Sequence, residues 1–285
     1  LNMMTAVKEA GLSIIGTSYE SMQIADDRGR FSQLMRELGL RQSENRTATS
    51  FEEVPILAKE VQYPVLLRPS HVLGGRNMAI VYDEQELESY LEGGVIVSCD
   101  APLLVDHFLE DAFEYDLDAI SDGKCLYIGG ILQHIEAAGI HSGDSAAVFP
   151  PYRSEPAMLE QMREAALAIA QRLNVVGFMN IQFAVQDNLL YVIEVNPRAS
   201  RTVPFISKTS QVDLVHAAVR IWEGETLRDQ GLVAPDDWIG EGSCAYGWAV
   251  KEAVFSFNRF VDMDPMLGPE MRSTGEVIGL GATFG

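Results

Sequence analysis

Hydrophobic residues recur along this chain with two different periods, and together these predict a mixed α+β fold. In residues 155–173 the apolar side chains Met158, Met162 and Ile169 return at helical spacing, which predicts a long amphipathic helix. In residues 180–201, NIQFAVQDNLLYVIEVNPRASR, apolar and polar positions alternate on either side of a polar Asp-Asn turn. That alternation predicts two antiparallel strands joined by the turn.

Shorter segments of the chain carry the same two patterns. We expect helices over residues 3–10, 26–38, 83–91 and 214–223, and a further helix that begins at Phe51 with Ser50 as its cap. We expect strands over residues 12–15, 46–49, 64–68, 77–82, 103–106, 113–120, 125–132, 244–257 and 276–280. The texture of the sequence changes after Gly231, so we place a domain boundary near residue 226. This mixture of elements indicates several α+β subdomains that share one cleft.

Composition restricts the partners that the chain can bind. The chain has 285 residues, of which 47% are hydrophobic, and a formal net charge of −20, so we expect a folded protein that binds neither nucleic acid nor anionic membranes. A site for an anionic ligand therefore needs cations concentrated locally, and Arg68, Arg76, Arg198 and Arg201 are candidates.

Cysteine usage and hydropathy bear on the compartment. The three cysteines are too widely spaced for a metal-binding pair and suit a reducing compartment. No apolar run is long enough to span a membrane, and the start of the sequence does not resemble a signal peptide. We expect a cytoplasmic protein.

The strongest candidate chemistry lies on the predicted hairpin. Glu194 and Asn196 are two residues apart on one strand and so point to the same face, and the neighbouring strand could bring Gln182 beside them. A carboxylate and two amide oxygens suit a hard cation, and Arg198 and Arg201 follow closely enough to bind phosphates. The alternative is an exposed polar strand face, but this strand runs directly into a cationic loop. The hairpin therefore predicts a cation-and-phosphate site, and with it a protein that handles ATP.

A glycine-containing turn is a weaker candidate for phosphate binding. Arg68 ends a predicted strand, and Gly74, Gly75 and Arg76 follow in the next turn. Glycines let backbone amides approach a phosphate, and a guanidinium nearby supplies charge. A plain hairpin turn between two strands fits the same residues.

Two polar loops are candidates for the remaining nucleotide contacts. Residues 106–111 follow a predicted strand, whose backbone groups could read an adenine edge while Glu114 holds a ribose hydroxyl; the alternative is an acidic solvated loop. His141 lies in residues 139–145, a compact loop with two glycines. This second loop could bind a phosphate or form a tight structural turn.

Five segments of the chain together carry a family resemblance: RPSHVLGGR, HIEAAGIHSGDSA, MNIQFAV, IEVNPRASRTVPFISK and LGPEMRSTGEVIG. They resemble the ATP-grasp superfamily, and within it the large chain of carbamoyl phosphate synthetase, in the same order and over essentially the whole chain. The family's large chain has two related halves, one that phosphorylates bicarbonate and one that phosphorylates carbamate. LGGR after RPS, together with NPRASRTVPF, resembles the second half.

The resemblance implies a fold and a division of the chain. The fold would be ATP-grasp, with the nucleotide in a cleft between two α+β subdomains. Residues 1–16 would be the tail of a preceding domain, and residues 17–225 the ATP-grasp domain with a lid subdomain over about 64–137. Residues 226–285 would be an extension that leads towards a regulatory domain absent from this sequence.

The same resemblance implies roles for individual residues. ATP would be surrounded by Arg28, Arg68, Gly74, Gly75, Arg76, His107, Leu109, Glu114, Gly139, Ile140, His141, Ser142, Gln182 and Glu194. Mg²⁺ or Mn²⁺ would be held by Gln182, Glu194 and Asn196. Relatives hold K⁺ near the positions of His134, Glu136 and Glu114. Catalysis would depend on Arg198, Arg201, His141 and Asn196, with the two arginines facing the phosphates and carbamate.

The activity implied is ATP-dependent phosphorylation of carbamate to carbamoyl phosphate, in arginine and pyrimidine synthesis. Its partners would be the first synthetase half and a glutaminase chain or domain that supplies ammonia. One alternative is another ATP-grasp ligase, biotin-carboxylase-like or D-alanine-ligase-like. The other is a non-catalytic nucleotide-binding or interface module of a larger assembly.

Overall fold

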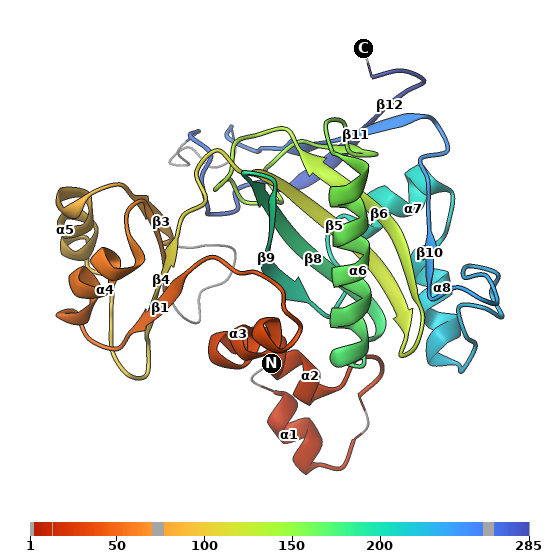
Figure 1. Ribbon diagram of the computed structural model, residues 1–285, viewed down its shortest axis with the longest axis horizontal. Coiled ribbons are helices and arrows are strands. Elements are labelled where there is room, and N and C mark those ends of the chain that lie inside the picture. Colours follow the sequence, from red (N-terminus) through yellow and green to blue (C-terminus); the bar gives the residue numbers. More distant parts are fainter. Residues whose placement is uncertain (1–2, 13, 70–76, 259–264, 285) are drawn as a thin grey trace.

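Two β-sheets of unequal size, each with its own helices, make up the fold (Figure 1). The computed structural model describes residues 3–12, 14–69, 77–258 and 265–284. Within these ranges the larger sheet has eight strands and the smaller sheet four. The combination of helices with mainly antiparallel sheets confirms the predicted α+β class.

The larger sheet joins segments that lie far apart in the sequence. Its strands run in the order β12-β11-β7-β6-β5-β8-β9, and β10 pairs with β6 outside this path. They are β5 (Phe113–Asp122), β6 (Leu126–His134), β7 (Ala147–Phe149), β8 (Val176–Gln186), β9 (Leu189–Asn196), β10 (Ile239–Glu241), β11 (Trp248–Val254) and β12 (Gly275–Gly281). The pairings are antiparallel apart from the parallel contact of β10 with β6.

Both faces of the larger sheet are covered by helices (Figure 1). On one face α6 (Pro156–Arg172) buries Met158, Met162 and Ile169, as predicted. On the other face lie α7 (Val203–Ser210), which packs on β6, and α8 (Leu214–Trp222), which packs on β5 and β8. Because of this two-sided cover, every residue of β6 is buried, including the polar ones.

The smaller sheet has a separate hydrophobic core. Its strand order is β1-β4-β2-β3, with β1 (Asn45–Ala48), β2 (Val65–Pro69), β3 (Ala79–Val81) and β4 (Leu103–His107). Helices α4 (Glu53–Val61) and α5 (Glu84–Glu92) cover it through residues such as Val54 and Leu87. Asp83 caps α5 as predicted, because its carboxylate accepts a hydrogen bond of 2.9 Å from the backbone of Glu86.

Three short helices precede the smaller sheet: α1 (Met4–Glu9), α2 (Tyr19–Asp26) and α3 (Arg28–Glu37). The predicted helix over 26–38 corresponds to α3, and its Phe31, Leu34 and Met35 are buried. These side chains join the core beneath α6. Helix α3 is therefore packed against the larger sheet.

Two of the local predictions are wrong, and one helix was missed. Of the strand predicted over 12–15, residue 13 lies outside the described residues, and residues 12, 14 and 15 belong to no strand; Leu12 is 64% exposed and Ile15 is 72% exposed. Ser50 does not cap α4, because that helix begins two residues later behind Glu52, which makes no side-chain capping bond. Helix α7 was not predicted, since Pro204 and three β-branched residues give its sequence a weak helical pattern.

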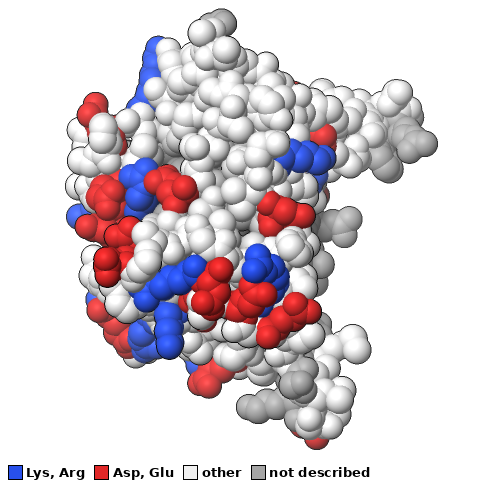
Figure 2. Space-filling model, turned by 90° about the vertical axis from the view of Figure 1, so that its right-hand side faces the viewer, with Lys and Arg blue, Asp and Glu red and all other residues white. Residues whose placement is uncertain are grey.

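The surface agrees with the acidic composition. On the face shown in Figure 2, Lys and Arg lie interleaved with Asp and Glu, so this face has no single positive patch among its described residues. None of the described helices combines the length and the hydrophobicity that a membrane crossing requires. The divisions at residues 17 and 226, and the lid over 64–137, remain predictions; the smaller sheet itself spans residues 45–107.

Candidate nucleotide and metal site

The hairpin of β8 and β9 brings the predicted metal ligands together. Gln182 and Glu194 are direct cross-strand partners, and the next pair on the same face of the hairpin is Asn180 with Asn196. The predicted turn is present, with Asp187 at φ 52° and Asn188 at φ 60°. These left-handed conformations are the ones that a tight two-residue hairpin turn requires. The sequence prediction that Gln182 lies beside Glu194 is confirmed.

Hydrogen bonds hold the polar groups of this face in place. The amide of Asn196 donates to Oε1 of Glu194 at 2.6 Å, and Arg198 donates to Oδ1 of Asn196 at 2.9 Å. Gln182 Nε2 donates to Oγ of Ser142 at 2.8 Å, which leaves the amide oxygen of Gln182 as the group available to a cation. The three predicted metal ligands and Arg198 are therefore oriented by hydrogen bonds among themselves and by one bond to Ser142.

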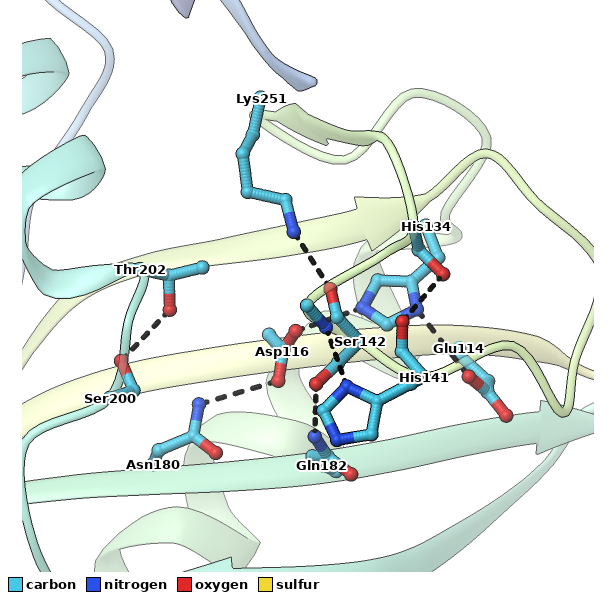
Figure 3. Close-up of polar contacts among 12 residues, drawn as sticks. Glu114, Asp116, His134, His141, Ser142, Asn180, Gln182, Ser200, Thr202 and Lys251 are labelled. Atoms are coloured by element: carbon cyan, nitrogen blue, oxygen red, sulfur yellow. Dashed lines mark hydrogen bonds and ion pairs between the residues drawn. The ribbon is translucent and has the colours of Figure 1, made fainter. Parts of the chain in front are cut away.

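The 139–145 loop lies over β8 and supplies that serine (Figure 3). In the same loop Nδ1 of His141 accepts a hydrogen bond of 3.0 Å from the backbone of Gly143. Burial lowers the pKa of His141, so its imidazole is neutral and carries its proton on Nε2. His141 is thus a hydrogen-bond donor through Nε2. The backbone of Gly139 donates to Oε1 of Glu114 at 3.2 Å, which ties the start of the loop to β5.

A buried polar network lies on β5, β6 and β8, beside the predicted metal ligands (Figure 3). His134 Nε2 donates to Asp116 at 2.9 Å, and its Nδ1 lies 3.4 Å from Oε2 of Glu114. Burial lowers the pKa of His134, but the hydrogen bonds and charges of Asp116 and Glu114 outweigh it and raise that pKa to about 9. Asn180 joins the network by donating to Asp116 at 3.3 Å and to Asp118 at 3.2 Å.

Asp118 anchors the loop that carries the two arginines. Ser200 donates to Asp118 at 2.5 Å and Thr202 also donates to this carboxylate, so residues 198–201 are held against β5. Burial, followed by the nearby charge of Asp116, raises the pKa of Asp118 to about 6. The position of the arginine loop therefore depends on a carboxylate in the core.

Residues 271–273, in the last described segment, form hydrogen bonds with two parts of the site. Arg201 donates to Met271 at 2.7 Å and to Ser273 at 3.2 Å. Asp144 accepts backbone hydrogen bonds from Arg272 at 2.7 Å and from Ser273 at 2.8 Å. The 139–145 loop and Arg201 are consequently both held by residues 271–273.

A second group of predicted residues gathers around Asp106 on β4. Arg68 lies 2.5 Å and Arg28 lies 3.8 Å from the same oxygen of this carboxylate. Burial raises the pKa of Asp106, against the opposing charge and hydrogen bond of Arg68. His107 Nδ1 lies 3.0 Å from the carbonyl of Gln62, so its ring is engaged by the smaller sheet.

Other predicted residues take the following places. Leu109 is buried in a small apolar cluster with Ala112 and Ala184. Arg198 is exposed, and Ile140 is half-buried. Gly74, Gly75 and Arg76, predicted to contact phosphates, lie outside the described residues.

Oxygen donors of the hairpin face fit a hard divalent cation. One carboxylate and two amide oxygens, from Glu194, Gln182 and Asn196, match the preferences of Mg²⁺. The described residues contain no group of three His, Cys, Asp or Glu side chains placed to hold a metal. The mixed carboxylate and amide face is thus the candidate metal site of the described chain.

Four functional candidates escaped the sequence analysis: Asp116, Asp118, Asn180 and Lys251. Asp116 and Asp118 alternate with apolar residues, a pattern that normally marks a solvent-facing side of a strand. Burial of both faces turns that pattern into an internal polar network. Lys251 had no local sequence signal, because only the pairing of β11 with β7 brings it to the site.

Solved structures with a similar fold include two biotin carboxylases. The biotin carboxylase of Campylobacter jejuni, solved with an ATP analogue, has a TM-score of 0.71 at 19% identity and covers 90% of this chain and 56% of its own. The biotin carboxylase domain of a Hydrogenobacter thermophilus carboxylase, solved with MgADP and bicarbonate, has a TM-score of 0.75 at 19% identity, covering 99% and 67%. At these identities the likeness shows the fold, which is ATP-grasp.

Sequence comparison narrows the class to one family. The family described as "Carbamoyl-phosphate synthase L chain, ATP binding domain" matches residues 27–230. The carbamoyl phosphate synthase large chains of Ralstonia nicotianae and Gemmatimonas aurantiaca are 48% and 50% identical over 100% of this chain. The chain belongs to this family of carbamoyl phosphate synthase large-chain ATP-binding domains. It spans about a quarter of the length of these curated relatives, 26% and 25% respectively.

Proposed function

We propose that this chain phosphorylates carbamate with ATP, as the second synthetase half of a carbamoyl phosphate synthase large chain. The observation that carries the proposal is the direct pairing of Gln182 with Glu194, with Asn196 and Arg198 hydrogen-bonded beside them. Support for the second half comes from the sequences LGGR and NPRASRTVPF. Arginine and pyrimidine synthesis are the pathways that we expect carbamoyl phosphate to serve.

The cation is part of the proposed site. Gln182, Glu194 and Asn196 would hold Mg²⁺, or Mn²⁺ in its place. A bound Mg²⁺ supplies positive charge against the β- and γ-phosphates during phosphoryl transfer. Glu136 has a buried oxygen, Oε2, without a hydrogen-bond partner among the described residues, which supports a K⁺ site near it and His134.

The chain's own residues would orient the reactants. His141 would donate its Nε2 proton to a phosphate oxygen, because its Nδ1 is already occupied as an acceptor. Arg198 and Arg201 would bind the transferring phosphoryl group and the carbamate oxygens. Carbamate is already an anion, so its oxygen would attack the γ-phosphorus of ATP without a general base. The bond from that phosphorus to the β,γ-bridging oxygen would break, and ADP would leave. Arg28 and Arg68, held by Asp106, would face the nucleotide.

Carbamate must reach this site from elsewhere. We propose that in the full enzyme the first synthetase half makes it, with ammonia supplied by a glutaminase, since the chain spans only about a quarter of its relatives' length, 26% of one of them. That fraction also favours the second candidate, a module that binds nucleotide without catalysis on its own. The solved biotin carboxylases suggest a third, another ATP-grasp ligase.

The reverse reaction tests the proposal without unstable carbamate. We expect the chain to form ATP from ADP and carbamoyl phosphate when Mg²⁺ is present, and Glu194→Ala to abolish this while its circular dichroism and melting curve stay those of a folded protein. ADP binding without ATP formation would support the non-catalytic module instead. ATP formation by the folded Glu194 variant at the full rate would overturn the assignment of the site.

A further inference from the structure

Lys251 lies completely inside the protein, although lysine is among the residues that are least often buried. Its exposed fraction is 0%, and it is one of the largest fully buried side chains. It sits on β11, between Ala147 of β7 and Ile278 of β12. Placing an ammonium in the core costs several kcal/mol unless it is compensated, and apolar residues of similar volume are often as stable. A buried lysine here therefore calls for a specific partner.

The partner that the structure shows is the 139–145 loop. Nζ of Lys251 donates to the backbone oxygen of Ser142 at 2.7 Å, across 109 positions of sequence (Figure 3). The charge of Lys251 is also felt by Asp116: burial raises the pKa of that carboxyl, but the hydrogen bond and charge of His134 and the charge of Lys251 outweigh it. The ammonium of Lys251 thus has the carboxylate of Asp116 as its counter-charge in the core, and it donates a hydrogen bond to the 139–145 loop.

Ser142 connects this lysine to the predicted metal ligands. The backbone oxygen of Ser142 accepts from Lys251, and its Oγ accepts from Nε2 of Gln182 at 2.8 Å. If Ser142 moved, Gln182 would lose the partner that fixes which end of its amide faces Glu194. Through these two hydrogen bonds, Ser142 connects the side chain of Lys251 on β11 with the side-chain amide of Gln182 on β8.

We propose that Lys251 is a positioning residue of the metal site: it holds the 139–145 loop against β8, so that Ser142 directs the amide oxygen of Gln182 toward the cation. The inference rests on the proposed nucleotide and metal site. Lys251 does not touch the nucleotide or the cation itself. Its effect is on the affinity for metal-bound nucleotide, because outer partners of metal ligands fix the geometry of those ligands.

Calorimetric titration of the full 285-residue chain with ADP, in excess Mg²⁺ and in EDTA, measures this effect. Lys251→Met is expected to weaken ADP binding in Mg²⁺ by about 10–100-fold, the usual effect of losing an outer-shell partner, and to leave binding in EDTA unchanged. The matched control is Lys208→Met, at an exposed lysine on α7, and it should change neither affinity.

A double-mutant cycle separates positioning from general stability. In a Ser142→Ala background Lys251→Met should cost much less, because both changes break the same connection to Gln182. Lys251→Gln, which keeps a neutral donor, serves if the methionine variant does not fold. Equal Mg²⁺-dependent affinity in a folded Lys251 variant would overturn the proposal, and so would additive costs.

Failure of both Lys251 variants to fold would also overturn it, since the lysine would then support the core rather than the metal ligands. The wild-type chain separates this proposal from the proposed function. Mg²⁺-dependent ADP binding by the wild type, with no effect of Lys251→Met, refutes only the positioning role. A wild type whose ADP binding ignores Mg²⁺ refutes the proposed metal site.

Discussion

Gly139→Ala perturbs the point where the 139–145 loop meets the smaller sheet. Gly139 has φ of +90°, and a Cβ there would lie 2.7 Å from Cδ1 of Ile80 and 2.9 Å from the ring of Phe108. Ile80 belongs to β3 and Phe108 directly follows β4, so the added methyl presses the loop and the smaller sheet apart. We expect this variant to be less stable than the wild type and to hold the 139–145 loop less closely against the smaller sheet.

The magnitude has two parts, which a control variant separates. The left-handed backbone costs an alanine about 1–2 kcal/mol, and the overpacked contact costs about 1–3 kcal/mol more. Gly94→Ala is the matched control, because Gly94 has φ of +85° and nothing within 4 Å of its Cβ position. In a chain of this size, each kcal/mol lowers the melting temperature by about 2–4 °C. Gly139→Ala should therefore melt about 10 °C below the wild type and Gly94→Ala about 4 °C below it.

Thermal denaturation followed by circular dichroism measures both variants. Ile80→Val removes the atom that lies closest to the added methyl, so it should restore about 1 kcal/mol in the Gly139→Ala background while costing about 1 kcal/mol alone. Equal melting temperatures for the Gly139 and Gly94 variants would refute the steric reasoning. Absence of any rescue by Ile80→Val would do the same for the assigned contact.

Three further predictions concern the charged groups. The raised pKa of His134, about 9 against 6.5 when unfolded, means that its stabilisation is complete below pH 6.5 and is lost as the pH rises through 9; by linkage this is on the order of 3 kcal/mol. Urea denaturation between pH 6 and 9.5 should show that loss in the wild type, and the urea midpoint of His134→Asn should not depend on pH. A midpoint of His134→Asn that falls with pH as steeply as that of the wild type would contradict this reasoning. Among the described residues, Arg68→Met leaves Asp106 buried with Arg28, 3.8 Å away, as its one remaining cation, so we expect a loss of about 3 kcal/mol in urea denaturation together with weaker ADP binding; unaltered stability would contradict the ion pair's role. Asp118→Ala strands three hydrogen-bond donors and releases the arginine loop, so ATP formation should fall more than nucleotide affinity does, and equal effects on both would count against the anchor.

The hairpin could be predicted because its signals are local. Alternation sets which side chains share a face, and the Asp-Asn turn sets the pairing from Gln186 with Leu189 to Phe183 with Val192. A bulge between Gln182 and Phe183 then shifts the register by one residue, so Gln182 pairs with Glu194, where the turn alone would have paired it with Ile193. The amphipathic helix α6 was equally clear from its spacing. The family resemblance assigns roles to these same hairpin residues, and the contacts of these residues with nucleotide and metal stay predictions.

Parts of the site that depend on distant pairing could not be predicted. The chain order gives no sign that β11 completes the sheet beside β7, so nothing in the sequence near Lys251 marks it as part of the site. Asp116 and Asp118 are not marked either, because the side chains that bind them, such as Asn180 and Ser200, come from other segments. Residues 12, 14 and 15 show the converse, because an apolar run forms a strand only where a partner edge exists, and these described residues have none.

The central claim is that the face of Gln182, Glu194 and Asn196 holds a divalent cation together with the phosphates of a nucleotide. Anomalous scattering from crystals of the chain grown with Mn²⁺ and ADP tests it most directly. We expect a manganese peak within coordination distance, about 2–2.5 Å, of oxygens from at least two of these side chains and of a phosphate oxygen. ADP bound with no manganese at this face, or with manganese elsewhere, would contradict the account.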